Sequence, residues 1–294
     1  MRSYISLLLS ILFLLGNVGL TQETAAAEKP DPQEIMRKSL SHWRRNLEAA
    51  KNYTYQQREV EQELERDGDV KKTEIKTSDI LMIYGEPYEK LIAKDDKPLT
   101  EKEQQKEEEK LNKFFDKQKN KSDEDRKKEQ AKEQEKFQRE IADELPRMLT
   151  WELVGDDNIS GQPTWILNAT PRADYHPKSM GGRLLSKISG RVWISKTDYQ
   201  WVKAEATLAD DFSVGWFLFK LHKGMHLEFE QTRINDEVWL PKRVFFNGSG
   251  RFAVKTGRFR NETTFSNYQR FKTDVRITGI ADEKLTDATV EAPK

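Results

Sequence analysis

The segment from residue 188 to residue 246 constrains the fold most, because apolar and polar side chains alternate along it in two successive hairpins. Residues 190–195 and 200–208 have the period of two that is typical of strands with one buried face. Between them, residues 196–199 include an aspartate suited to a turn. We expect a connection of odd length, which places four small or aliphatic residues on one face. These residues are Val192, Ile194, Val202 and Ala204.

The second hairpin is predicted around Asn235 and Asp236, which tolerate positive φ and suit a two-residue turn. Such a turn places Glu228 opposite Arg243. Pro241 has no backbone N–H to donate, so its strand is expected to lie at an edge or to contain a bulge. The face on the other side of this hairpin would carry Leu227, Phe229, Lys242 and Val244.

The rest of the chain is also rich in strand signals. Asp31 and Pro32 begin a predicted helix, along which apolar residues recur at helical spacing up to Leu47. Strands are expected at 53–64, 70–84, 88–93, 151–154 and 164–169, with two or three more between 251 and 271. Short turns between them favour antiparallel neighbours. The sequence therefore predicts an α+β fold that is mostly β, with an antiparallel sheet and an N-terminal helix.

Residues 100–145 interrupt this pattern as a charged helical insertion. From 100 to 140, 26 of 41 residues are charged, which is too polar for a separate core. Thr100 and Glu103 form a capping box, and residues 120–123 mark a break between two exposed helices. The insertion is either a solvated excursion from the sheet or an arm that binds a protein partner.

The N-terminus has the pattern of a signal peptide, which we assign to residues 1–27. A basic residue, an apolar run at 4–15 and three alanines at 25–27 follow one another in the order that export requires. The alternative is an uncleaved membrane anchor, for which the run is short. We expect residues 28–294 to form a single domain that is exported to a periplasm.

Composition excludes several classes of function. The chain has no cysteine, and its 50 basic residues balance its 50 acidic residues, so nothing in its charge favours nucleic acid as a partner. Motifs of hydrolases, phosphate-binding loops and zinc proteases are absent. His222 and His226 would share a face with two glutamates, but a polar solvated face explains them better than a metal site. We expect no enzymatic activity, no cofactor and no metal.

The most apolar stretch of the mature chain is 211–221. It is either a lid over a cavity, a segment that makes transient contact with a membrane, or simply a buried element. The lid candidates are Trp216, Phe217 and Phe219.

The motif at 192–198, followed by Trp201-Val202-Lys203, is similar to one in the outer-membrane lipoprotein-sorting family. The resemblance extends over residues 31–272 apart from the insertion. It implies a half-open β-barrel whose helices close over an apolar cavity for acyl chains, and hence a carrier of lipids or lipoproteins. The chain departs from the family in its insertion and in having no lipid-attachment cysteine.

The candidate ligand-binding residues are Val192, Ile194, Val202, Ala204, Leu208, Leu227 and Phe229. Two alternatives stay open. The same side chains would serve equally well as ordinary core beneath the N-terminal helix. Separately, the protein could be an envelope sensor or interaction module that docks a partner through residues 100–145.

Overall fold

The structure, a computed structural model, describes residues 29–137, 143–177, 179–215, 219–252 and 255–271. All of its helices and strands belong to one compact unit that begins at Pro32. The predicted signal peptide and residues 272–294 lie outside the described residues. Within the described part, no helix is both long enough and apolar enough to cross a membrane.

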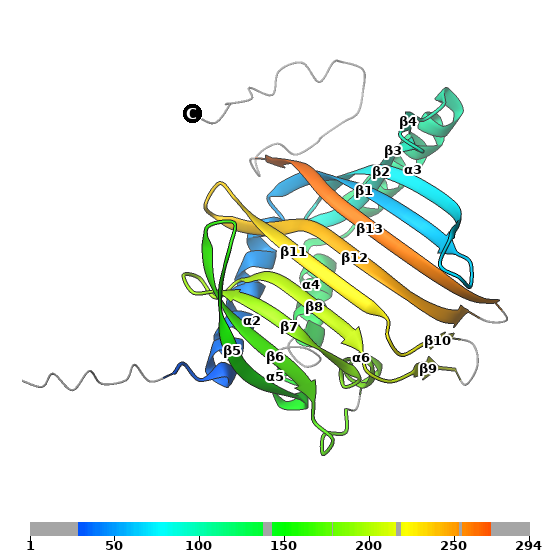
Figure 1. Cartoon of the computed structure of the whole chain (residues 1–294). Coiled ribbons are helices and arrows are strands. Elements are labelled where there is room, and N and C mark those ends of the chain that lie inside the picture. The colour runs from blue at the N-terminus through cyan, green and yellow to red at the C-terminus, as the bar shows by residue number, and fades with distance from the viewer. Residues whose placement is uncertain (1–28, 138–142, 178, 216–218, 253–254, 272–294) are drawn as a thin grey trace, which may run out of the picture. The chain divides into compact units, whose positions relative to one another are not determined.

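The fold is mostly β, as predicted, and its strands form one open, curved antiparallel sheet of 13 strands (Figure 1). In chain order they are β1 (Tyr53–Leu64), β2 (Val70–Ile83), β3 (Glu86–Lys94), β4 (Lys97–Pro98), β5 (Leu149–Ile159), β6 (Gln162–Pro171), β7 (Ile188–Ser195), β8 (Trp201–Leu208), β9 (Phe212–Val214), β10 (Phe219–Leu221), β11 (His226–Ile234), β12 (Val238–Phe252) and β13 (Lys255–Arg270).

The order across the sheet is β4-β3-β2-β1-β13-β12-β11-β8-β7-β6-β5, with β10 paired to β12 and to β9. β13 inserts between β1 and β12, which joins the first and last strands of the chain (Figure 1). The two ends of the sheet, β4 and β5, do not pair with each other, so the half-open arrangement implied by the resemblance is confirmed.

Helices cover part of this sheet. The five described helices are α2 (Pro32–Ala50), α3 (Glu101–Lys119), α4 (Asp123–Phe137), α5 (Leu145–Met148) and α6 (Met180–Leu185). The first half of α2 contributes Ile35, Met36 and Leu40 to the main core, where they pack with side chains of β6, β7 and α5. The helix predicted from Asp31 and Pro32 is therefore confirmed, and it lies against the sheet.

The hairpin β7–β8 has the expected faces along most of its length. Val192 pairs with Ala204, which in turn pairs with Phe229 of β11, so these three side chains form one row on neighbouring strands. A bulge then makes Trp201, and not Val202, the partner of Ile194. The predicted pairing was wrong at this one position, because an extra residue in β8 changes the register.

The hairpin β11–β12 has positive φ at Asn235 and Asp236, as predicted. Its turn is one residue longer than expected, and a bulge next to Pro241 shifts the register again. The prediction that Glu228 lies opposite Arg243 was therefore wrong, since Glu230 occupies that place. The predicted bulge itself is confirmed.

The strands β5 and β6 are longer than the sequence suggested. The expected strands were 151–154 and 164–169, but only Ser160 and Gly161, both with positive φ, lie between β5 and β6. Polar side chains are compatible with a strand here because β5 is an edge strand whose outer residues face solvent.

The insertion contains two helices separated at residues 120–122, as predicted. Its first helix, α3, packs against the sheet, however. Phe114 and Phe115 of α3 contact the rings of Tyr88 and Tyr84, with centroids 4.9 and 5.6 Å apart, and Leu111 is buried. The expectation of two exposed helices was wrong for α3, because its apolar face packs against the β2–β3 hairpin.

Candidate functional site

The second half of α2 leaves a cleft between itself and the sheet. This cleft, which we call the α2 cleft, has a volume of about 520 Å³. Its walls come from α2 and the residue that follows it, from β1, β2, β3, β11 and β12, and from the turn between β2 and β3. The residues that line it are Trp43, Arg44, Asn46, Leu47, Glu48, Ala50, Lys51, Tyr55, Met82, Gly85, Glu86, Pro87, Phe229, Gln231, Trp239, Leu240 and Pro241.

Asn46 fixes the position of the helix over this cleft. Its side-chain Nδ2 donates to the carbonyl oxygen of Trp239, and the backbone N–H of Trp239 donates to its Oδ1, both at 2.7 Å. Asn46 is itself buried, so these bonds are shielded from water. The side chain thus supplies β12 with the hydrogen bonds that a backbone neighbour would otherwise make.

Leu47 shows that the apolar stripe of α2 is not fully used by the core. Ile35 and Leu40 on the same stripe are 2% and 3% exposed, whereas Leu47 is 42% exposed. An exposed leucine alone is common. Here it lies at the wall of a cleft that also contains Met82 and Phe229, so the apolar surface is continuous. Such a surface is suited to bind an apolar ligand.

Charged side chains occur at the helix side of the cleft. Arg44 has no ion pair among the described residues, whereas Lys51 pairs with Glu48 at 3.0 Å. Tyr55 lies on the opposite side, where burial raises the pKa of its phenol above the ordinary value. The hydroxyl of Tyr55 therefore stays protonated at neutral pH.

Of the ligand-binding candidates from the sequence, Phe229 lines the α2 cleft. Val192 and Ile194, 3% and 0% exposed, pack beneath the first half of α2, with Ala204 beside them. These three side chains belong to the packed core between helix and sheet, as the alternative of an ordinary core would have them.

The remaining candidates lie elsewhere. Val202 is buried outside that cluster, and Leu208 belongs to a second cluster with Phe212 and Leu221. Leu227 is 38% exposed and does not line the α2 cleft. Their role in ligand binding stays a prediction.

The lid candidates are only partly described. Trp216 and Phe217 lie outside the described residues. Phe219 begins β10, where it is half-buried and packs against the cluster of Leu208, Phe212 and Leu221. The ends of the apolar stretch 211–221 are thus anchored in a small core of their own.

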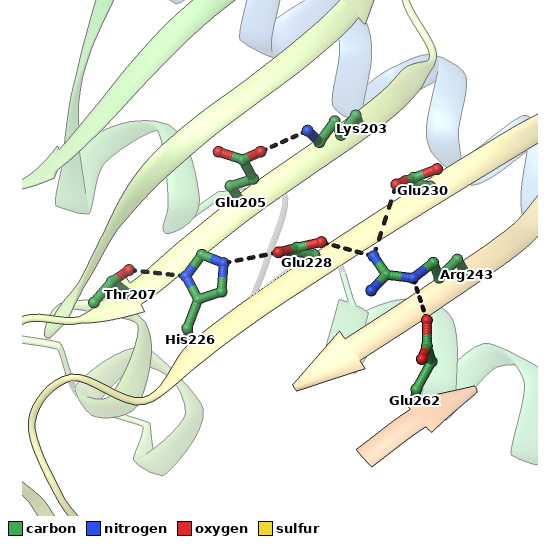
Figure 2. A network of polar contacts seen from close by, with 8 residues as sticks. All are labelled: Lys203, Glu205, Thr207, His226, Glu228, Glu230, Arg243 and Glu262. Carbon is green, nitrogen blue, oxygen red and sulfur yellow. Dashed lines mark hydrogen bonds and ion pairs between the residues drawn. The ribbon is translucent and has the colours of Figure 1, made fainter. Parts of the chain in front are cut away.

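The other face of the sheet is polar. Figure 2 shows a chain of contacts along β8, β11, β12 and β13, in which Arg243 lies 2.6 Å from Glu228 and 2.6 Å from Glu262. His226 Nε2 is 3.2 Å from the same Glu228, whose pKa Arg243 holds below its ordinary value. On this face Arg243 and Lys203 lie over the rings of Phe245 and Trp193, so charged groups cover these aromatic side chains, and the α2 cleft lies on the side of the sheet better suited to a lipid.

Neither His222 nor His226 takes part in a metal-binding cluster. Among the residues that the structure describes, no group of three or more histidine, aspartate or glutamate side chains is arranged to hold a metal ion.

No protein-family model and no curated protein matches the sequence. Solved structures do match it. A domain described as an outer-membrane lipoprotein-sorting protein, from Vibrio parahaemolyticus, is 10% identical, with coverage of 81% of this chain and 92% of that one and a TM-score of 0.31. A DUF1329-family protein from Desulfovibrio piger is 12% identical, with coverage of 84% and 95% and a TM-score of 0.31. A LolA-superfamily protein from Nitrosomonas europaea is 10% identical, with coverage of 83% and 94% and a TM-score of 0.28.

The matched structures thus include proteins of the family that the sequence resembles.

Several residues of the cleft were missed from the sequence. These include Asn46, Met82 and Gln231, which lie in segments that are far apart in the chain. The sequence around each of them is that of an ordinary helix or strand and does not indicate a shared site. The one available signal was Leu47, because it extends the apolar stripe of α2 by a further turn.

Proposed function

We propose that the protein is a non-enzymatic periplasmic carrier or binding protein that holds a lipid, or the acyl chains of a lipoprotein, in the α2 cleft. The observation that carries this proposal is the apolar cleft of about 520 Å³ between α2 and the sheet. Sites for small ligands typically have volumes of about 300–1,000 Å³.

The driving force would be the removal of apolar surface from water. Each Å² of apolar surface that ligand and cleft bury together contributes roughly 25 cal/mol. Leu47, Met82 and Phe229 provide such surface on the helix and on two separate strands. A long flexible chain is a better fit than a rigid polar substrate, because most of the surface that lines the cleft is apolar.

A displacement assay with a fluorescent fatty acid tests this proposal, with protein isolated from periplasm. The variant L47E places a charge in the wall of the cleft at a position where the side chain is already 42% exposed, so folding should be little affected. We expect the affinity to fall by about tenfold or more, since a charge is costly in an apolar site.

V154E is the matched control, because Val154 on β5 is 44% exposed and does not line the cleft. It should bind the probe as the wild type does. Equal binding by L47E and V154E, or no binding by the wild type, would count against a ligand in this cleft.

A second candidate function rests on α4. Its described side chains are exposed, except that of Arg126, which lies over the ring of Tyr84 at 5.0 Å. A charged and uncovered helix is suited to dock an envelope protein. Reversing the charges of Lys127, Lys128 and Lys132 should abolish capture of such a partner from envelope extracts and leave fatty-acid binding intact.

A further inference from the structure

The described part of the chain ends beside the α2 cleft. The backbone N–H of Phe271 donates to the carbonyl oxygen of Asn52 at 3.0 Å, and the residue before Asn52 is Lys51, which lines the cleft. Three residues before Phe271, the ring of Tyr268 lies 6.0 Å from that of Tyr55, another residue of the cleft wall. The residues that follow Phe271 therefore leave the fold next to the cleft.

Residues 272–294, which follow, include a short apolar segment at 275–280, which we call the terminal segment. Its sequence is Val-Arg-Ile-Thr-Gly-Ile, so Val275 and Ile277 alternate with polar side chains. A period of two is typical of an extended chain with one apolar face. Such a face is favourable in water only when it packs against another apolar surface.

The connection is long enough for the terminal segment to reach the cleft. An extended chain spans about 3.3–3.6 Å per residue, so the path from Phe271 to Ile277 reaches about 20 Å at most. Leu47 lies on the last turn of α2, and the helical rise puts it roughly 8 Å from Asn52 along the axis. Ile277 can therefore contact Leu47 without any change in the fold.

The short connection also means that weak binding is sufficient. A segment attached close to its site has an effective concentration in the range of roughly 1 mM. A segment that binds with millimolar affinity as a free peptide would thus occupy the cleft about half of the time. The cleft offers a suitable surface, because Leu47 is 42% exposed and shares the wall with Met82 and Phe229.

We propose that residues 275–280 bind in the α2 cleft, with Val275 and Ile277 on the apolar wall at Leu47, and that a ligand displaces them when it enters. The docking follows from the position of Phe271 and the sequence after it, whereas the competition rests on the proposed function. The terminal segment covers the apolar wall between ligands, so only molecules that bind more strongly than the segment gain access.

Disulfide trapping tests the docking directly. The chain has no cysteine, so an introduced pair reports on a single contact. In the full chain, L47C combined with I277C should form a disulfide within one molecule on mild oxidation, as read by mass spectrometry of unreduced peptides. A disulfide requires Cα atoms about 4.4–6.8 Å apart, so its formation places residue 277 on the cleft wall. An excess of fatty acid should slow the reaction about threefold or more.

Two further pairs are the controls. V154C with I277C should react at least about tenfold more slowly, because Val154 is 44% exposed on β5 and does not line the cleft. L47C with V290C should also react more slowly, because Val290 belongs to the same chain end but lies outside the terminal segment. Thermal melts establish that each variant is folded.

A second measurement needs no cysteine. V275D combined with I277D puts two charges on the apolar face of the terminal segment, so the segment should no longer compete. The full chain with these changes should bind the fluorescent fatty acid about threefold or more tightly than the wild type, because the cleft is then open for a larger fraction of the time. A288D with V290D adds the same charge outside the terminal segment and should bind as the wild type does.

A disulfide that forms no faster in L47C with I277C than in V154C with I277C would overturn the inference, whether or not the protein binds fatty acid. A disulfide that joins two molecules would overturn it as well, because the occupant would then come from a second copy. Rapid trapping within one molecule, together with no binding of the fatty acid, would support the docking and contradict the proposed function. Equal fatty-acid affinity of the wild type and of V275D with I277D would overturn the competition.

Discussion

At the scale of single residues, Asn46 connects the sequence to the site most directly. It joins a helix near the N-terminus to a strand 193 residues later. Asparagine in the middle of a helix is usually unfavourable, because its side chain competes for backbone hydrogen bonds. In this protein the Asn46 side chain bonds the backbone of β12 instead, and these bonds hold the second half of α2 beside the cleft.

We expect N46A to lower the free energy of unfolding by about 2–4 kcal/mol. The change removes two buried hydrogen bonds and leaves the N–H and the carbonyl of Trp239 unpaired. Urea denaturation followed by tryptophan fluorescence measures this difference.

R45A is the control for this variant, because Arg45 is the preceding residue and is exposed. It should alter stability by less than about 0.5 kcal/mol. If N46A were no less stable than R45A, Asn46 would not be what holds the helix.

At the scale of elements, short sequence motifs correctly predicted features that depend on neighbouring residues alone. The break at 120–122 and the capping box of Thr100 and Glu103 both appear as expected, and the Glu103 carboxylate accepts from the backbone N–H and the hydroxyl of Thr100. The pKa of Glu103 is lowered to about 2, chiefly by Lys94 and then by Thr100. The sequence could not reveal what α3 packs against, because Tyr84 and Tyr88 come close to α3 only when the β2–β3 hairpin folds.

The docking of α3 makes a testable difference. F114A removes the ring contact with Tyr88, and an aromatic pair of this kind contributes about 0.5–1.5 kcal/mol beyond its buried area. We expect faster amide hydrogen exchange throughout residues 101–119, with no change in β6–β8. K113A is the control, because Lys113 is exposed on the same helix.

Unchanged exchange in residues 101–119 of F114A would contradict the packing of α3 against β3. Faster exchange across the whole sheet would instead mean that the insertion is needed for the stability of the fold.

The strand register illustrates a limit of the same kind. Positive φ at Asn235 and Asp236 follows from the residues themselves. The bulges at Pro241 and at the pairing of Trp201 with Ile194 depend on both strands at once. The parity of the connecting loop therefore paired Val192 with Ala204 correctly and misplaced Val202.

At the scale of the whole molecule, fold class follows from the sequence because alternation and turn chemistry recur along the chain. The site does not follow in the same way. Three of the predicted binding residues, Val192, Ile194 and Ala204, pack in the core beneath the first half of α2, whereas the cleft lies beside its second half. Phe229 was predicted from the alternation along its own hairpin, and it lines the cleft.

The central claim is that an acyl chain occupies the α2 cleft, and photo-crosslinking tests it most directly. Protein loaded with a diazirine-bearing fatty acid is irradiated, digested and mapped by mass spectrometry. We predict adducts in residues 43–51 and 229–241, which disappear when unlabelled fatty acid competes. Adducts confined to other segments, or adducts that competition does not remove, would contradict the claim.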